Sequence, residues 1–125
     1  MNKRERVLAA VSGGTPDRVP CGFWLHFPQG YEAGPEAVKI HLDFFASSGT
    51  DLCKVMNENS LPNNPELNTP QDWGKLEKIP HDAPFLVRQI DLVRRVCQAV
   101  QGEAVVLATI HGMVASAFHY LGGGA

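Results

Sequence analysis

The chain has 125 residues, of which 44% are hydrophobic, and its formal net charge at pH 7 is -2. Eleven basic residues against 13 acidic ones give no positive surface for nucleic acid. Every apolar run is much shorter than the ~20 residues that cross a membrane. The composition is that of an ordinary globular protein with enough apolar residues for one core.

The beginning of the chain, MNKRERVLAA, lacks the long apolar run and small-residue cleavage site of a signal peptide, so it predicts a first helix. Three cysteines, Cys21, Cys53 and Cys97, lie far apart in apolar segments and form no C-x-x-C pair. This spacing favours reduced, buried thiols in a cytoplasmic protein over a disulfide or a metal clip.

The first half of the chain alternates helix and strand signals. Capping residues, prolines and glycines mark the ends of the helices, and apolar runs between them mark the strands. The predicted elements are a helix capped by Asn2 and ending near Ser12, a strand at Cys21–Phe27, a helix from Pro35 to Ser48, and a strand within Thr50–Asn57.

The second half begins with an Asn- and Pro-rich loop from Glu58 to Asn68. It then contains the most regular helical pattern of the chain, with an apolar stripe that we expect to face the core. The stripe consists of Leu86, Ile90, Val93, Cys97 and Val100. The other predicted elements are a short helix opened by Thr69-Pro70, a strand at Ala104–Ile110, and a last helix, GMVASAFHYL, that runs into Gly122-Gly123-Gly124.

Strands that are apolar on both faces and alternate with amphipathic helices predict an α/β fold with a parallel sheet. No glycine-rich phosphate loop follows a strand, which weakens a dinucleotide-binding interpretation. Three strand–helix units are too few for a closed (β/α)8 barrel, which takes ~250 residues, and a three-stranded sheet would expose two apolar edges. We therefore expect the N-terminal part of a TIM (β/α)8 barrel, with the rest of the barrel absent from these 125 residues.

Three blocks carry a resemblance to a known family. The stretch NKRERVLAAVSGGTPDRVPCGFW resembles the N-terminus of the uroporphyrinogen decarboxylase superfamily, which also contains the corrinoid-linked methyltransferases that act on coenzyme M and related thiols. The stretch VVLATIHGMVASAFHYLGGGA is similar to the family's third strand and its helix, and SGTDLCKVMNE takes the place of the second strand. The resemblance covers essentially the whole chain, residues 1–125, and implies a TIM-type barrel.

The sequence departs from the decarboxylases at the residues that hold substrate. Their first strand is followed by an Arg-Gln-Ala-Gly-Arg-Tyr motif whose arginines bind carboxylates, a task that suits the planar guanidinium. This chain has LHFPQGY, which places Leu25 and Gln29 at the arginine positions. The family's aspartate after the second strand, which engages pyrrole nitrogens, falls at Asn57 or Glu58.

In a barrel, side chains at the C-terminal ends of the strands face the active site. This rule selects His26, Asn57, Glu58 and His111 as candidate catalytic residues, and Gln29 and Tyr31 on the first loop as candidate substrate-binding residues. The structural alternatives are a His26 packed between Trp24 and Phe27 and a His111 that caps the following helix.

Other polar residues have mainly structural interpretations. His41 lies on the apolar stripe of its helix, which favours a core histidine with satisfied hydrogen bonds. Lys54 either pairs with an acid such as Glu58 or lies near a rim, and Asp17 and Arg18 are expected to fasten the floor of the barrel.

The leading functional interpretation is a uroporphyrinogen decarboxylase-like lyase that acts on a small-molecule tetrapyrrole carboxylate. The first alternative is methyl transfer to or from a thiol, which would need zinc and a corrinoid protein. The methyltransferases bind zinc through a His-x-Cys pair and a later Cys; no H-x-C occurs here, and the family's zinc motif would come later in the chain, so this absence does not decide between the alternatives. The second is an inactive partial barrel that acts only in assembly. No cofactor is expected within these residues, and the expected partner is the rest of the barrel or another copy through open sheet edges.

Overall fold

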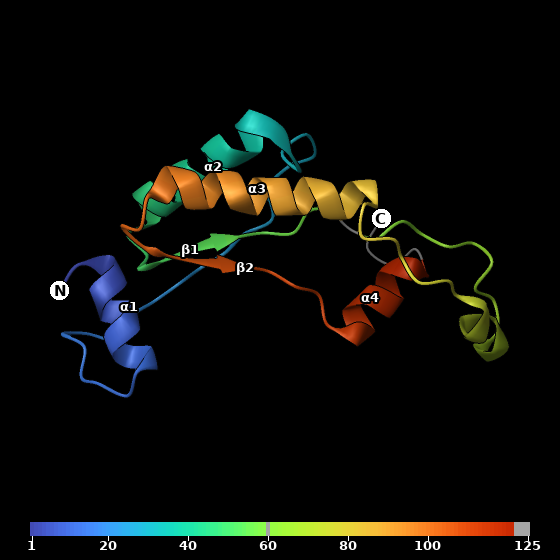
Figure 1. Cartoon of the computed structure of the whole chain (residues 1–125), viewed down its shortest axis with the longest axis horizontal. Helices are drawn as coiled ribbons and strands as arrows, with labels where there is room; N and C mark the ends of the chain where they lie inside the picture. The colour runs from blue at the N-terminus through green and yellow to red at the C-terminus, as the bar shows by residue number, and fades with distance from the viewer. Residues whose placement is uncertain (60, 122–125) are drawn as a thin grey trace.

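The computed structural model of the chain describes residues 1–59 and 61–121, so the glycine run expected at 122–124 lies outside the described residues. Helices and two short strands follow one another along the chain (Figure 1). They are α1 (Lys3–Val11), α2 (Gly34–Ser48), β1 (Leu52–Val55), the 3₁₀ helix η1 (Pro70–Lys75), α3 (Pro84–Val100), β2 (Val105–Ala108) and α4 (Met113–Tyr120).

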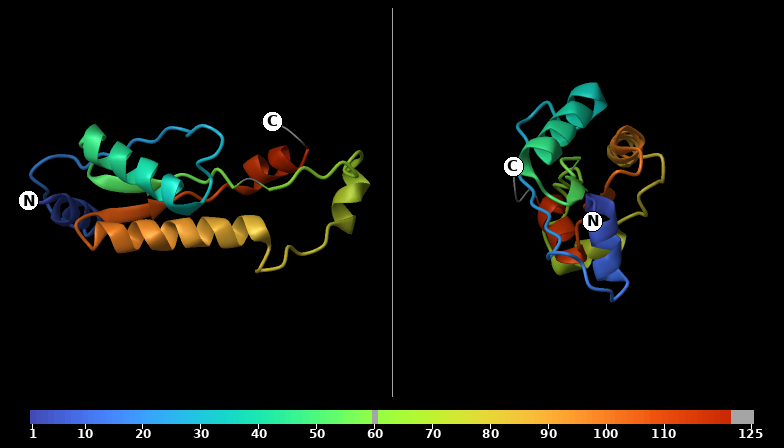
Figure 2. Two further views of the ribbon diagram at one scale, coloured as in Figure 1. Left: turned by 90° about the horizontal axis from the view of Figure 1, so that it is seen from above. Right: turned by 90° about the vertical axis from the view of Figure 1, so that its left-hand side faces the viewer.

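The sheet consists of β1 and β2, which pair in parallel with Leu52 opposite Val105 and Val55 opposite Ala108. Helices α2 and α3 lie side by side on one face of this sheet (Figures 1 and 2). Helix α1 lies near the beginning of the strands, whereas η1 and α4 lie beyond their C-terminal ends.

The predicted barrel portion with three parallel strands is wrong for this structure. The segment Cys21–Phe27 runs beside β1, and the Cys21 carbonyl accepts hydrogen bonds from the backbone N–H groups of Asp51 and Leu52, but no strand forms there. A β-ladder needs a continuous run of backbone hydrogen bonds, which apolar side chains alone do not supply. Trp24 and Leu25 also remain 54% and 40% exposed, so this run is not the buried strand that its composition indicated.

The core forms between the strands and the two helices. Cys53 and Val55 point to the helices and are completely buried, and the other buried members of this core are Ala37, Leu92, Val96, Val100 and Ala104. The predicted buried stripe of α3 is therefore displaced around the helix: Leu92 and Val96 are buried, whereas Ile90 is 53% exposed. Cys97 is also exposed, which corrects the expectation that all three thiols are buried.

Helix α1 begins as predicted because Asn2 and Glu5 form a capping box. The Asn2 Oδ1 atom accepts a hydrogen bond from the Glu5 N–H at 2.8 Å, and the Glu5 carboxylate accepts one from the Asn2 N–H at 2.9 Å. The helix ends at Val11, shortly before Gly13.

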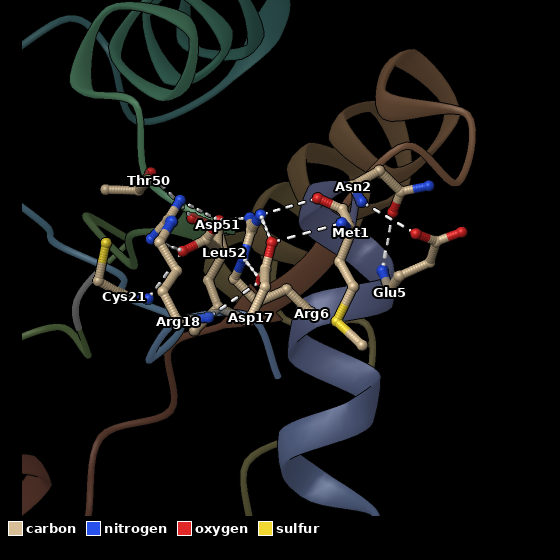
Figure 3. Close-up of polar contacts among 10 residues, drawn as sticks. All are labelled: Met1, Asn2, Glu5, Arg6, Asp17, Arg18, Cys21, Thr50, Asp51 and Leu52. Atoms are coloured by element: carbon tan, nitrogen blue, oxygen red, sulfur yellow. Dashed lines mark hydrogen bonds and ion pairs between the residues drawn. The ribbon is translucent and has the colours of Figure 1, made fainter. Parts of the chain in front are cut away.

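An ionic cluster joins α1 to the beginning of β1 (Figure 3). The Asp51 carboxylate is completely buried and accepts hydrogen bonds from the side chains of Arg6 and Arg18 and from the backbone N–H of Cys21. Arg6 also binds both oxygens of Asp17, which holds the pKa of Asp17 well below its usual range. Burial alone would raise the pKa of Asp51, but its hydrogen bonds outweigh burial and the pKa is lowered. These charged groups stabilise the end of the sheet at which β1 begins, whereas Glu58 follows the other end of β1.

Among the described residues, no helix combines the length and the apolar character that a membrane crossing requires.

Candidate functional site

The C-terminal ends of β1 and β2 lie at one edge of the sheet because the strands are parallel. Glu58 follows β1, and His111 follows β2. The backbone N–H of Thr109 donates a hydrogen bond to the Val55 carbonyl at 3.1 Å, so the chain segments after the two strands begin side by side. Three of the predicted catalytic residues, Asn57, Glu58 and His111, follow the strands at this edge.

His26 and Glu58 are in direct contact. The His26 Nδ1 atom lies 3.2 and 3.1 Å from the two carboxylate oxygens of Glu58. The backbone N–H of Phe27 donates to the same carboxylate at 3.1 Å. The His26 side chain is 63% exposed, whereas that of Glu58 is only 17% exposed. A largely buried carboxylate therefore orients an imidazole that is open to solvent and to a ligand.

Trp24 supports the exposed histidine from one side. Its ring packs edge-on against the His26 imidazole, with 5.3 Å between the ring centroids. The Lys54 ammonium lies 5.1 Å from the centroid of the Trp24 ring, so Lys54 contacts an aromatic face rather than forming an ion pair with Glu58.

His111 lies close to this pair. Burial lowers the pKa of His111, and the charges of His119 and His26 lower it further, while Glu58 acts in the opposite direction. The His111 and His119 rings also pack against each other, with centroids 4.9 Å apart. The neutral form of His111 is therefore favoured, and the ring lies beside a second histidine from α4.

The side chains of Asn57 and Glu58 line two different cavities. The Asn57 Oδ1 atom accepts a hydrogen bond from the Asn59 N–H, and its side chain lines an apolar groove between α3 and β2. Glu58 lines a polar cavity and contacts His26. Of the two residues between which the sequence left the choice open, Glu58 is thus the one beside the histidine.

The two predicted substrate-binding residues lie on the loop before α2. Gln29 is exposed and Tyr31 is half-buried. Within residues 1–59 and 61–121, neither forms a hydrogen bond with His26, Glu58 or His111. Their substrate-binding roles stay a prediction.

A polar network that was not predicted from the sequence lies next to Glu58. Asn59 is only 4% exposed, and its side chain binds the Glu32 carbonyl, the Gln89 side chain and the Arg88 side chain. Asn59 could have been predicted as a site residue from its position, one residue after Glu58 at the end of a predicted buried strand. Arg88 and Gln89 gave no comparable signal because they lie on a helix that is far away in the sequence.

The described residues form no cluster of three or more His, Cys, Asp or Glu side chains with the spacing of a metal site. Cys53 is buried in the core and Cys97 is exposed on α3, so neither thiol lies at the edge that holds His26 and Glu58.

Comparison of the chain with protein families, with curated proteins and with solved structures finds no significant match.

Proposed function

We propose that this chain carries the proton-transfer residues of a cytoplasmic enzyme of the uroporphyrinogen decarboxylase superfamily, a lyase that acts on a small-molecule carboxylate. The observation that supports this proposal is the contact of 3.1 Å between His26 Nδ1 and the Glu58 carboxylate. The sequence resemblance supplies the reaction class, and the contact supplies a chemically reasonable role for the two residues.

In this proposal His26 Nδ1 carries a proton and donates a hydrogen bond to the Glu58 carboxylate, which leaves Nε2 to accept or deliver a proton. When a carboxyl group leaves as CO2, the electron pair of the broken carbon–carbon bond stays on the substrate carbon, which then takes up a proton. His26 in its protonated form is the proton donor in this proposal. Glu58 positions the imidazole and stabilises its positive charge.

Methyl transfer to or from a thiol is the close alternative; in that branch of the superfamily zinc activates the thiol, and the zinc-binding His-x-Cys pair would come later in the chain. An inactive protein that acts only in assembly is the remaining alternative. Each alternative predicts a different result in the same set of assays.

The test is turnover of uroporphyrinogen, measured as loss of substrate carboxyl groups by chromatography. We expect His26→Gln to lower the rate by about 100-fold or more, since general acid–base groups contribute factors of this size. His81→Gln, a matched change at an exposed histidine, is expected to leave the rate unchanged. A folded protein without turnover, or a His26→Gln variant with full turnover, would contradict the proposal.

A second measurement tests the role of Glu58 without an assay of activity. Nitrogen-15 spectra of the neutral His26 ring are expected to show the proton on Nδ1. Glu58→Gln is expected to remove this preference. A neutral His26 with its proton on Nε2 in the unsubstituted protein would contradict the positioning role.

A further inference from the structure

A polar cavity of about 530 Å³ opens beside Glu58. It is bounded by the loop before α2, by the segment after β1 and by α3. Its lining residues are Glu32, Ala33, Glu58, Asn59 and Arg88.

Asn59 fixes the guanidinium of Arg88 at the wall of this cavity. The Asn59 Oδ1 atom accepts a hydrogen bond from Arg88 Nε at 3.0 Å. The Asn59 Nδ2 atom donates to the Glu32 carbonyl at 2.7 Å and to Gln89 Oε1 at 3.0 Å. The buried amide is therefore held from three directions, and its oxygen is available to Arg88 in one orientation only.

Arg88 reaches Asn59 through its Nε atom, and its two terminal nitrogens have no hydrogen-bond partner among residues 1–59 and 61–121. A guanidinium that is held at Nε presents these nitrogens as a fork that matches the two oxygens of a carboxylate. Because the fork is already oriented, less conformational entropy is lost on binding.

Two carboxylates accompany this single cation. Both oxygens of Glu32 accept a hydrogen bond from the Gly30 N–H, which is the main reason that the pKa of Glu32 is lowered, and the positive charge of Arg88 contributes as well. Glu58 binds His26 and Phe27 but retains lone pairs for another donor. A ligand with anionic groups alone would meet repulsion here, whereas a ligand with an anionic end and a donor end would match both signs of charge.

We propose that this cavity binds a small molecule that carries a carboxylate and an N–H donor, with the carboxylate on Arg88 and the N–H group on Glu32 or Glu58. The inference rests on the proposed function for the role of Glu58, and it identifies Arg88 as the cation that Leu25 and Gln29 do not provide. A pyrrole carboxylate and an amino acid both belong to this class of ligand.

The test uses 4-aminobutyrate as the probe, with butyrate and butylamine as analogues that each lack one end. Binding is followed by the Arg88 Nε–H signal in nuclear magnetic resonance spectra. We expect saturable shifts with 4-aminobutyrate, at a dissociation constant on the order of millimolar, and at least about tenfold weaker binding of either analogue. Equal binding of butyrate and 4-aminobutyrate would contradict the requirement for a donor.

Arg88→Gln is expected to weaken binding of the probe, followed by isothermal titration calorimetry, by about tenfold or more. Arg88→Lys, which keeps the charge but not the fork, is expected to fall between Arg88→Gln and the unsubstituted protein. Arg94→Gln is the matched control, since Arg94 is an exposed residue of the same helix that pairs with Asp91. Unchanged binding in the Arg88→Gln variant would overturn the inference.

His26→Gln separates this inference from the proposed function. His26 does not line the cavity, so this variant is expected to keep the affinity for the probe while it loses turnover. Loss of turnover without any binding of the probe to the unsubstituted protein would refute the cavity's role and leave the role of His26 standing. Binding without turnover in the unsubstituted protein would refute the proposed lyase and leave the cavity standing.

Discussion

The buried Asp51 carboxylate lies 2.6 Å from Nη1 of Arg6, a residue 45 positions earlier in the chain. This contact joins the first helix to the start of β1. Arg18 donates hydrogen bonds to both oxygens of the same carboxylate, so one acidic side chain orders two separate segments before the strand. Asp17 and Arg18 were expected from the sequence to have a fastening role, whereas no local pattern marked Asp51 as the residue that Arg6 and Arg18 both bind.

Replacement of Asp51 by alanine is expected to destabilise the protein by about 3 kcal/mol, because it leaves the nearly buried Arg6 guanidinium with less compensation. The free energy of unfolding in urea measures this effect. Asp43→Ala is the control, since Asp43 pairs with Lys39 on the surface, and a loss of at most about 0.5 kcal/mol is expected there. Equal losses in the two variants would show that the cluster has no special role.

Stability is expected to fall as the solution is acidified below about pH 6.5. Burial lowers the pKa of His41, although its hydrogen bond to the Ala37 carbonyl and the charge of Glu58 oppose this shift. The unfolded chain therefore takes up a proton at this histidine before the folded protein does, and protonation favours unfolding. The backbone N–H of Met56 donates to His41 Nε2, which also requires the neutral ring.

The melting temperature at about pH 7.5 and at about pH 5.5 checks this expectation. His41→Gln should reduce the difference between the two values, even though it lowers stability at both. His81→Gln, at an exposed histidine, is the matched control for His41→Gln. A melting temperature that rises on acidification would mean that the burial of His41 does not dominate its titration.

The cysteines are expected to react with iodoacetamide in a fixed order. Cys97 is exposed, whereas Cys53 is completely buried and burial raises its pKa to about 11. Mass spectrometry at about pH 8 should find Cys97 modified in the folded protein and Cys53 modified only after denaturation. Rapid labelling of Cys53 without unfolding would contradict its place in the core.

Self-association through the edge of β2 is expected. In the described part of the chain, β2 pairs with β1 alone, so its other edge carries no strand. Ile110, which is 87% exposed, lies at the end of this edge, and exposed apolar strands are templates for pairing between chains. Sedimentation velocity over a range of concentrations should therefore detect dimers or larger species.

Ile110→Lys is expected to shift this equilibrium toward the monomer. Val19→Lys, at an apolar residue that is 83% exposed but belongs to the segment before Cys21, should have little effect. A monomer at every concentration well above micromolar would refute association through this edge.

The sequence by itself determined most of the helices, because the signals that begin and end a helix are local. Asn2 and Glu5 lie three residues apart, and Asp72 accepts a hydrogen bond from the Thr69 N–H at the beginning of η1. The two strands that form were also predicted, since β1 and β2 lie within apolar runs between helices. Hydrogen bonds within a helix close over four residues, so a short window of sequence contains nearly all the relevant information.

Only the tertiary structure decided the rest. Cys21–Phe27 has a strand-like composition, but a strand also needs a complete ladder with a partner about 30 residues away, and that ladder does not form. Two neighbouring apolar stripes of α3 could face the core, and packing against β1 selected Leu92 and Val96. The contact between His26 and Glu58, 32 residues apart, depends in the same way on how distant segments lie against each other, which no local pattern specifies.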